Sequence, residues 1–186
     1  IVDLGCRTGG VTTLILERIQ STKDSVIYAV DHSTSALKAA AEEIGERKDV
    51  AINYVHSEVQ NLADAVKERV DAIVYCNSIH YVPDKPNLLA QIKGKLSPNG
   101  IFAFNTSFFD GSHPPDSHEF FRKWMMRSLR ILKREHGLSA DKAAKVESRV
   151  QLTADQYIEF VENAGFRVEV NDLNRVEVPH EGYHHI

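Results

Sequence analysis

The stretch Ile1–Gly10, which reads IVDLGCRTGG, decides the fold. Its first four residues form the apolar end of a strand, and a glycine-rich turn follows at once. Residues 11–19 then place apolar side chains at helical spacing. A glycine-rich turn between a strand and a helix lets a ligand approach the backbone and the N-terminus of the helix closely. The stretch therefore predicts a nucleotide-type ligand site at the carboxyl end of a first strand.

The same strand–helix unit repeats along the chain. β-rich or continuous apolar runs predict strands at 26–30, 51–55, 70–76 and 101–105, and helical patterns separate them at 35–44, 62–68 and 87–96. After a further helix that Thr153 caps, we expect a sixth strand at 166–170 and a seventh at 175–178. This alternation predicts an α/β, Rossmann-like fold, in which a mostly parallel seven-stranded sheet has helices on both faces.

Residues 107–150 interrupt this alternation, because they contain no strand candidate and much helical pattern. We interpret them as a helical insertion after strand five, within a single domain that spans residues 1–186. The chain starts inside a strand pattern and without Met. We therefore expect a further N-terminal segment of the domain to precede Ile1.

Composition narrows the class of protein. The net charge of −4 argues against a nucleic-acid partner. No run of about 18 apolar residues is present, so no integral membrane span is expected. The two cysteines form no spaced framework and, with no secretory signal visible, they favour a reducing cytoplasm. The sequence leaves the oligomeric state open.

The glycine loop distinguishes between two nucleotide patterns. The dinucleotide pattern G-x-G-x-x-G fails, because Arg7 takes the place of its second glycine and only Gly10 matches its third. The alternative is an acid that closes the strand, followed by G-x-G-x-G. Asp3, Gly5 and Gly9 match that pattern and Arg7 departs from it. The loop thereby resembles that of the Class I S-adenosylmethionine-dependent methyltransferases, whose usual form is DLGCGTG.

The resemblance implies roles for the first two strand ends. Asp3, Gly5 and Gly9 would hold the methionine end of S-adenosylmethionine, and Asp31 would hold its ribose hydroxyls. The residues themselves support the second role, because a carboxylate at a strand's carboxyl end accepts two hydroxyl donors at once. A helix-capping or solvated acid is the alternative for Asp31. His32 follows it and would neighbour the adenine site.

Three later segments extend the resemblance. VHSEVQNL at 55–62 is similar to the family's VxGDAxNL, which implies that Glu58 meets the adenine amino group and Val59 lies beside the ring. CNSIHYVPD at 76–84 is similar to NxxLHHxxD, which implies that Cys76 and Asn77 line the methyl-transfer site. LSPNGIFAF before and within strand five resembles LKPGGxLxx.

The resemblance implies a methyltransferase that acts on a small, apolar or acyl-type molecule, with S-adenosylmethionine as cofactor. A second hypothesis is a non-catalytic cofactor-binding or partner protein with a degenerate loop, since Arg7 could crowd the methionine end. We expect the Arg7 side chain to leave the loop, because burying an unpaired guanidinium is costly. A nicotinamide-dependent oxidoreductase is a third class, and the absence of G-x-G-x-x-G speaks against it.

His80 is the one candidate for a catalytic side chain. It would act as a general base near the substrate if the methyl acceptor must lose a proton. The alternative is a histidine that packs and hydrogen-bonds beneath the loop after strand four. The sequence leaves both interpretations open.

Residues 119–136 combine an apolar stripe with six Lys or Arg against two Glu, a local net charge of +4. One interpretation is a helix that packs its stripe on the core. The other is a cover over the substrate pocket, with Trp124, Met125 and, at its entrance, Phe108 as substrate-binding residues. The basic face would also suit an acidic carrier protein or an anionic membrane surface.

Residues 180–184 read HEGYH and fit the zinc-binding pattern H-E-x-x-H. That pattern needs both histidines on one face of a helix. Pro179 precedes the motif and Gly182 interrupts it, so no metal site is expected.

Overall fold

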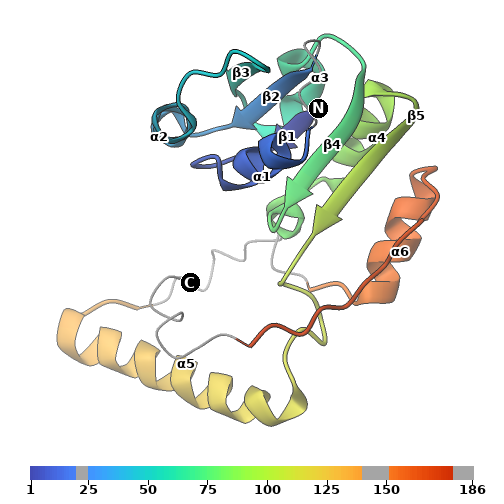
Figure 1. Ribbon diagram of the computed structural model, residues 1–186. Helices are drawn as coiled ribbons and strands as arrows, with labels where there is room; N and C mark the ends of the chain where they lie inside the picture. Colours follow the sequence, from blue (N-terminus) through green and yellow to red (C-terminus); the bar gives the residue numbers. More distant parts are fainter. Residues whose placement is uncertain (20–24, 140–150, 178–186) are drawn as a thin grey trace.

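The computed structural model describes residues 1–19, 25–139 and 151–177. Figure 1 shows a sheet at one end of the molecule and a long helix set apart from it. The elements run in the order β1 (Val2–Leu4), α1 (Gly10–Arg18), β2 (Val26–Asp31), α2 (Thr34–Ile44), β3 (Ala51–His56), η1 (Val59–Asn61), α3 (Leu62–Ala65), β4 (Val70–Cys76), η2 (Ile79–Tyr81), α4 (Lys85–Lys95), β5 (Leu96–Asn105), α5 (Pro115–His136) and α6 (Ala154–Asn163).

The sheet has five strands in the order β3-β2-β1-β4-β5, and all neighbouring pairs are parallel. After β1 the chain adds β2 on one side of β1, and it later adds β4 on the other side. Parallel strands end at the same edge of a sheet, so the carboxyl ends of β1, β2 and β4 meet at this change of direction. The α/β, Rossmann-like class predicted from the sequence is confirmed.

Alternation along β2 explains why helices cover both faces of the sheet. Ile27 packs with Leu16 of α1, and Ala29 packs with Leu37 of α2, on one face. Val30 belongs to the larger cluster on the other face, which α3, α4 and α6 complete. Both faces are therefore covered, which is the usual condition of a parallel sheet.

The helix starts follow the capping residues in the sequence. Ser33 Oγ accepts a hydrogen bond from the Ala36 amide at 3.2 Å, and Asp84 caps α4 in the same way. Thr153 and Gln156 form a reciprocal capping box at the start of α6. These bonds satisfy amide groups that have no partner within the helix.

The prediction of a sixth and a seventh strand is wrong for the part of the chain that the structure describes, since residues 166–177 form no strand. A strand needs an edge to which its backbone can bond. Instead the Phe166 ring packs on Phe102 with centroids 5.7 Å apart, and Tyr157 packs on Phe104 at 5.9 Å, so this part of the chain contacts the core face of the sheet through side chains. Val170 is 74% exposed. Val178 lies outside the described residues.

Candidate functional site

The glycine loop is held tightly against β2. The amides of Gly5 and Cys6 both donate to the carbonyl oxygen of Val30, at 2.8 and 3.0 Å. Gly5 and Gly9 have left-handed φ angles of 72° and 88°, which favour glycine. A Cβ on Gly5 would lie 3.2 Å from the Tyr75 ring, and one on Gly9 would lie 3.1 Å from a carbon of α2. The glycines therefore let the loop turn between β4 and α2.

Arg7 occupies the third left-handed position of the loop, with φ 50°. Its side chain is exposed, as expected. Its backbone amide donates to Asp31 Oδ2 at 2.9 Å. The substitution thus keeps the turn that a glycine would make, at a cost of about 1–2 kcal/mol for the left-handed conformation.

Asp31 is buried at the carboxyl end of β2 and anchors two loops. Oδ2 accepts from Arg7, and Oδ1 accepts from the Ser33 amide at 2.8 Å. The His32 ring nitrogen lies 3.4 Å from Oδ1, and the His32 side chain is 67% exposed. Each carboxylate oxygen has two lone-pair sites, so each keeps one for a ligand hydroxyl after binding its backbone amide.

Asp3 lies beneath the loop instead of on its surface. The carboxylate is buried and accepts a hydrogen bond from the Thr12 hydroxyl at 2.6 Å. Burial raises the pKa of Asp3 to about 6, and the nearby charge of Asp31 adds to the rise. Asp3 therefore organises the start of α1, and its predicted role at the methionine end of the cofactor stays a prediction.

The carboxyl ends of β4 and β5 are tied together. The Asn77 amide donates to Asn105 Oδ1 at 2.7 Å, and Asn77 Oδ1 accepts from both the amide and the hydroxyl of Ser107 at 2.9 Å. Cys76 is half-buried beside Asn77, whose φ is 48°. Sequence reasoning missed Asn105 and Ser107. The sequence signal for both residues was a polar side chain at or just after the end of a strand, whose carboxyl end lies at the same edge of the sheet as the other strand ends.

The end of β3 completes this edge. The Ser57 amide donates to the Asp31 carbonyl oxygen at 3.0 Å, and a His56 ring nitrogen lies 2.8 Å from the His32 carbonyl oxygen. The next two residues follow directly, with Glu58 exposed and Val59 half-buried against the core. The structure thus brings the predicted cofactor residues of all four strand ends to one edge of the sheet.

His80 lies in η2 and is buried. Its Nδ1 atom is 3.0 Å from the Thr106 hydroxyl, and its ring packs against Tyr81 and Phe108 with centroids 4.1 and 5.1 Å apart. Burial lowers the pKa of His80, and Lys85 lowers it further. This environment is that of a neutral histidine packed beneath a loop, with Phe108 as one wall.

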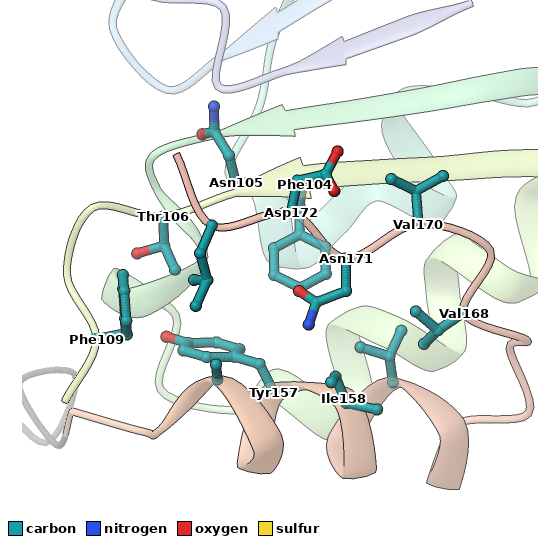
Figure 2. Close-up of a pocket in the computed structure, with 13 residues that line it drawn as sticks. Phe104, Asn105, Thr106, Phe109, Tyr157, Ile158, Val168, Val170, Asn171 and Asp172 are labelled. Carbon is teal, nitrogen blue, oxygen red and sulfur yellow. The ribbon is translucent and has the colours of Figure 1, made fainter. Parts of the chain in front are cut away.

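A cavity of about 190 Å³ lies next to this histidine. Figure 2 shows it between the end of β5, α6 and the extended segment after α6. Its lining residues come from those three places: Phe104, Asn105, Thr106, Phe109, Ala154, Tyr157, Ile158, Val161, Val168, Val170, Asn171, Asp172 and Leu173. The sequence did not predict this cavity, because its walls are about fifty residues apart in the chain.

The two substrate residues predicted on α5 do not line this cavity. Trp124 is 54% exposed and Met125 is 51% exposed. The apolar stripe does not pack on the core either, since α5 lies apart from the sheet in Figure 1. Phe108 remains near His80, but the structure does not bring it together with Trp124 and Met125.

No group of three or more His, Cys, Asp or Glu within the described ranges could hold a metal ion. The HEGYH motif at 180–184 lies outside these ranges. The helices that the structure describes include none with the length and apolar character needed to cross a membrane.

A known protein family matches the part of the chain that forms the edge described above. A family model described as a methyltransferase domain matches residues 2–102, which is more than half of the chain. The match includes the glycine loop and the ends of β1 to β4. The chain belongs to the Class I S-adenosylmethionine-dependent methyltransferase family.

Curated relatives of this methyltransferase are distant. It is 29% identical over 111 residues to a malonyl-(acyl-carrier protein) O-methyltransferase of Halalkalibacterium halodurans, covering 57% of this chain and 38% of the relative. It is 24% identical over 186 residues to a trans-aconitate 2-methyltransferase of Delftia acidovorans, covering 100% of this chain and 62% of the relative. The chain therefore spans less than two thirds of the length of either relative.

Solved structures share the fold of this methyltransferase. A putative methyltransferase of Haloferax volcanii, solved with the Trm112 methyltransferase activator, aligns with a TM-score of 0.61 at 18% identity. The alignment covers 96% of this chain and 66% of that one. The family match ends at residue 102 within β5, so all of the residues that line the cavity lie outside the matched part of the chain.

Proposed function

We propose that this chain binds S-adenosylmethionine across the carboxyl ends of β1, β2 and β4 and transfers its methyl group to a small, apolar or acyl-type molecule. The observation that carries the proposal is the convergence of Gly5, Asp31 and Asn77 at the change of direction in the sheet. Open α/β sheets bind ligands at such points.

The residues present fit this cofactor. The left-handed turn at Gly5 has no side chain to fill the edge, and Asp31 keeps lone pairs for the ribose hydroxyls. Glu58 is exposed at the end of β3 and would meet the adenine amino group, with Val59 beside the ring. The bound cofactor supplies a methyl group already activated by a positive sulfur atom.

The chain's own contribution is alignment. Asn77 and Cys76 would border the methyl end of the site, and the ties from Asn77 to Asn105 and Ser107 hold this border rigid. A rigid border favours in-line approach of an oxygen, nitrogen or carbon nucleophile. The lowered pKa of His80 keeps its ring neutral near pH 7, so it would accept a proton only from an acceptor that must lose one.

The alternative function is a non-catalytic cofactor-binding or partner protein. It rests on Arg7, whose departure from the glycine pattern would block the methionine end. Calorimetric titration with S-adenosylmethionine and with its demethylated product separates the two functions. Tight binding of both, with methyl transfer to at least one member of a panel of apolar and acyl acceptors, supports the enzyme. Failure of both ligands to bind would contradict the proposal.

We further propose that α5 contacts an acidic acyl-carrier protein. Large apolar side chains, including Trp124, Met125 and Leu129, are exposed on this helix, and most of its basic side chains form no ion pair within the described part of the chain. The activity named for one relative, on malonyl-(acyl-carrier protein), supports this partner. Salt-dependent binding to a carrier protein is expected; binding to anionic vesicles alone would assign α5 to a membrane surface.

The proposal includes a cytoplasmic location. It is supported by Cys6 and Cys76, which are both free, because reducing compartments keep thiols unpaired.

A further inference from the structure

The Thr106 hydroxyl lies at the centre of a small hydrogen-bond network between the end of β5 and η2. Its Oγ1 atom is 3.0 Å from His80 Nδ1, accepts a hydrogen bond from the Phe108 amide at 3.0 Å and lies 3.4 Å from the Phe108 carbonyl oxygen. A neutral histidine donates from one ring nitrogen and accepts at the other. The direction of the bonds in this network therefore decides which nitrogen of His80 carries the proton.

A count of protons and lone pairs gives that direction. A threonine hydroxyl has one proton and two acceptor lone pairs. The Phe108 amide occupies one lone pair, and the Phe108 carbonyl oxygen can only accept, so the hydroxyl donates its proton there. The second lone pair is left for the ring, and His80 Nδ1 must donate to it. All three bonds form together in this arrangement alone.

The reverse arrangement satisfies fewer groups. If the hydroxyl donated to His80 Nδ1, the Phe108 carbonyl oxygen would lose the hydrogen bond that it accepts from Thr106, and a lost bond to a half-buried carbonyl is unfavourable. Burial raises the pKa of Tyr157, and nearby Thr106 offsets part of that rise. The Tyr157 hydroxyl nevertheless forms no hydrogen bond with the residues that the structure describes, so it does not compete for the second lone pair.

The His80 ring is neutral and held in place. Burial lowers its pKa, and Lys85 lowers it further, so the ring carries one proton at neutral pH. The rings of Tyr81 and Phe108 pack against it with centroids 4.1 and 5.1 Å away. Within the described ranges no residue bonds Nε2, and this atom is not one of the fully buried polar atoms that lack a partner. Nε2 is therefore not sealed within the core.

We propose that Thr106 is a positioning residue, whose hydroxyl holds the neutral His80 ring with its proton on Nδ1 and leaves Nε2 as a proton acceptor. The position of the proton does not depend on the proposed function, but its use rests on that function. In methyl transfer to a hydroxyl or an amine, Nε2 would take the proton that the acceptor atom loses, and the resulting imidazolium would pass it to water. A carboxylate acceptor has no proton to lose and would gain nothing from this base.

Nuclear magnetic resonance locates this proton directly. The whole chain is isotope-labelled at its histidine ring nitrogens, and a long-range proton–nitrogen correlation spectrum at pH 8 distinguishes protonated from unprotonated ring nitrogens. His80→Gln removes one set of signals and so assigns it. We expect the wild type to carry the proton on Nδ1. Thr106→Val should lower the ratio of the Nδ1–H form to the Nε2–H form about 3- to 10-fold, which is the net value of one hydrogen bond, and Thr106→Ser should restore the ratio.

Two further variants assign the effect to this network. Thr13→Val is the matched control, because the Thr13 hydroxyl also donates to a backbone carbonyl oxygen, that of Gly9 at 3.0 Å, and its loss should leave the His80 proton in place. Tyr157→Phe should also leave the proton on Nδ1, since the phenol takes no part in the network. Thermal unfolding checks that each variant folds. If Thr106→Val does not fold, the wild type and Thr106→Ser still carry the test.

The inference and the proposed function fail separately. A proton on Nε2 in the wild type or in Thr106→Ser, an unchanged ratio in Thr106→Val, or a displaced proton in Tyr157→Phe would overturn the inference. Absence of S-adenosylmethionine binding, with the proton still found on Nδ1, would overturn only the proposed function. Retained S-adenosylmethionine binding with the proton on Nε2 would overturn only the inference.

Discussion

Asp31→Asn should weaken both the fold and cofactor binding. In the wild type, the two carboxylate oxygens accept the amides of Arg7 and Ser33 at 2.9 and 2.8 Å. Asparagine offers one oxygen and one NH2 group, so one backbone amide would face another donor. Losing one hydrogen bond to a charged group costs about 1.5–3 kcal/mol. For a chain of this size that lowers Tm by about 3–12 °C.

The same change should weaken S-adenosylmethionine binding. If Asp31 also accepts a ribose hydroxyl, the loss of that bond is again about 1.5–3 kcal/mol. At 1.4 kcal/mol for each factor of ten, Kd rises by about 10- to 150-fold. Isothermal titration calorimetry, run well below the lowered Tm, measures this change.

Ser33→Ala is the control for stability alone. It removes the hydroxyl that accepts from the Ala36 amide, at a cost of about 1 kcal/mol for a lost helix cap. The Ser33 backbone amide that bonds Asp31 remains. Kd should therefore stay within twofold. If Asp31→Asn also left Kd unchanged while lowering Tm, Asp31 would be a loop anchor only, and the reasoning about the ribose would be refuted.

Three further changes test other parts of the site. Burial raises the pKa of Asp3 to about 6, so its contribution to stability is full below its unfolded pKa near 4 and is lost as pH rises through 6. Asp3→Asn should raise the free energy of unfolding at pH 7.5 by up to about 3 kcal/mol. In urea titrations the variant should also show a flatter pH dependence of this free energy between pH 4 and 6, and an unaltered pH profile would contradict the assignment. Arg7→Gly should relieve the left-handed backbone and keep cofactor Kd within twofold, whereas abolished binding would make Arg7 a direct ligand. Trp124→Ala, at a half-exposed position, should change the free energy of unfolding by no more than about 0.5 kcal/mol while weakening binding to the carrier protein. A loss of thermal stability alone would contradict a role in recognition.

The first five strands were predictable because their signals are local. β4 is a continuous apolar run, and the glycine loop and Ser33 mark element ends that the structure retains. The segment Ser97–Gly100 has the composition of a turn, but it lies within β5, which begins at Leu96. The run after Gly165 has the same β-rich composition, yet it forms no strand. A strand there would need backbone bonds to the edge of β5, whereas the contacts that the structure shows are those of the Phe166 and Tyr157 rings on Phe102 and Phe104. No local pattern carries this information.

The residues of the candidate site also divide into those that local sequence identifies and those whose position depends on tertiary packing. The strand ends at Gly5, Asp31 and Asn77 could be named because a strand's end and its polar residue are adjacent in sequence. The burial of Asp3 beneath the loop and the hydrogen bond from Asn77 to Asn105 depend on tertiary structure, which the local sequence does not show. The stripe on α5 gave a correct amphipathic helix, but periodicity alone does not say what an apolar face contacts.

The dipeptide Asn105–Thr106 has a consequence for how such enzymes diverge. Asn105 bonds toward the cofactor edge and Thr106 toward His80 and the cavity, with Cα atoms about 3.8 Å apart. A substitution at either position should therefore disturb both the proposed cofactor edge and the cavity wall, which leaves little freedom for change there. The opposite wall, at Ile158, Val161 and Val168, belongs to α6 and the segment after it. Substitutions that reshape the cavity should therefore accumulate on α6 and the segment after it, while the end of β5 stays fixed.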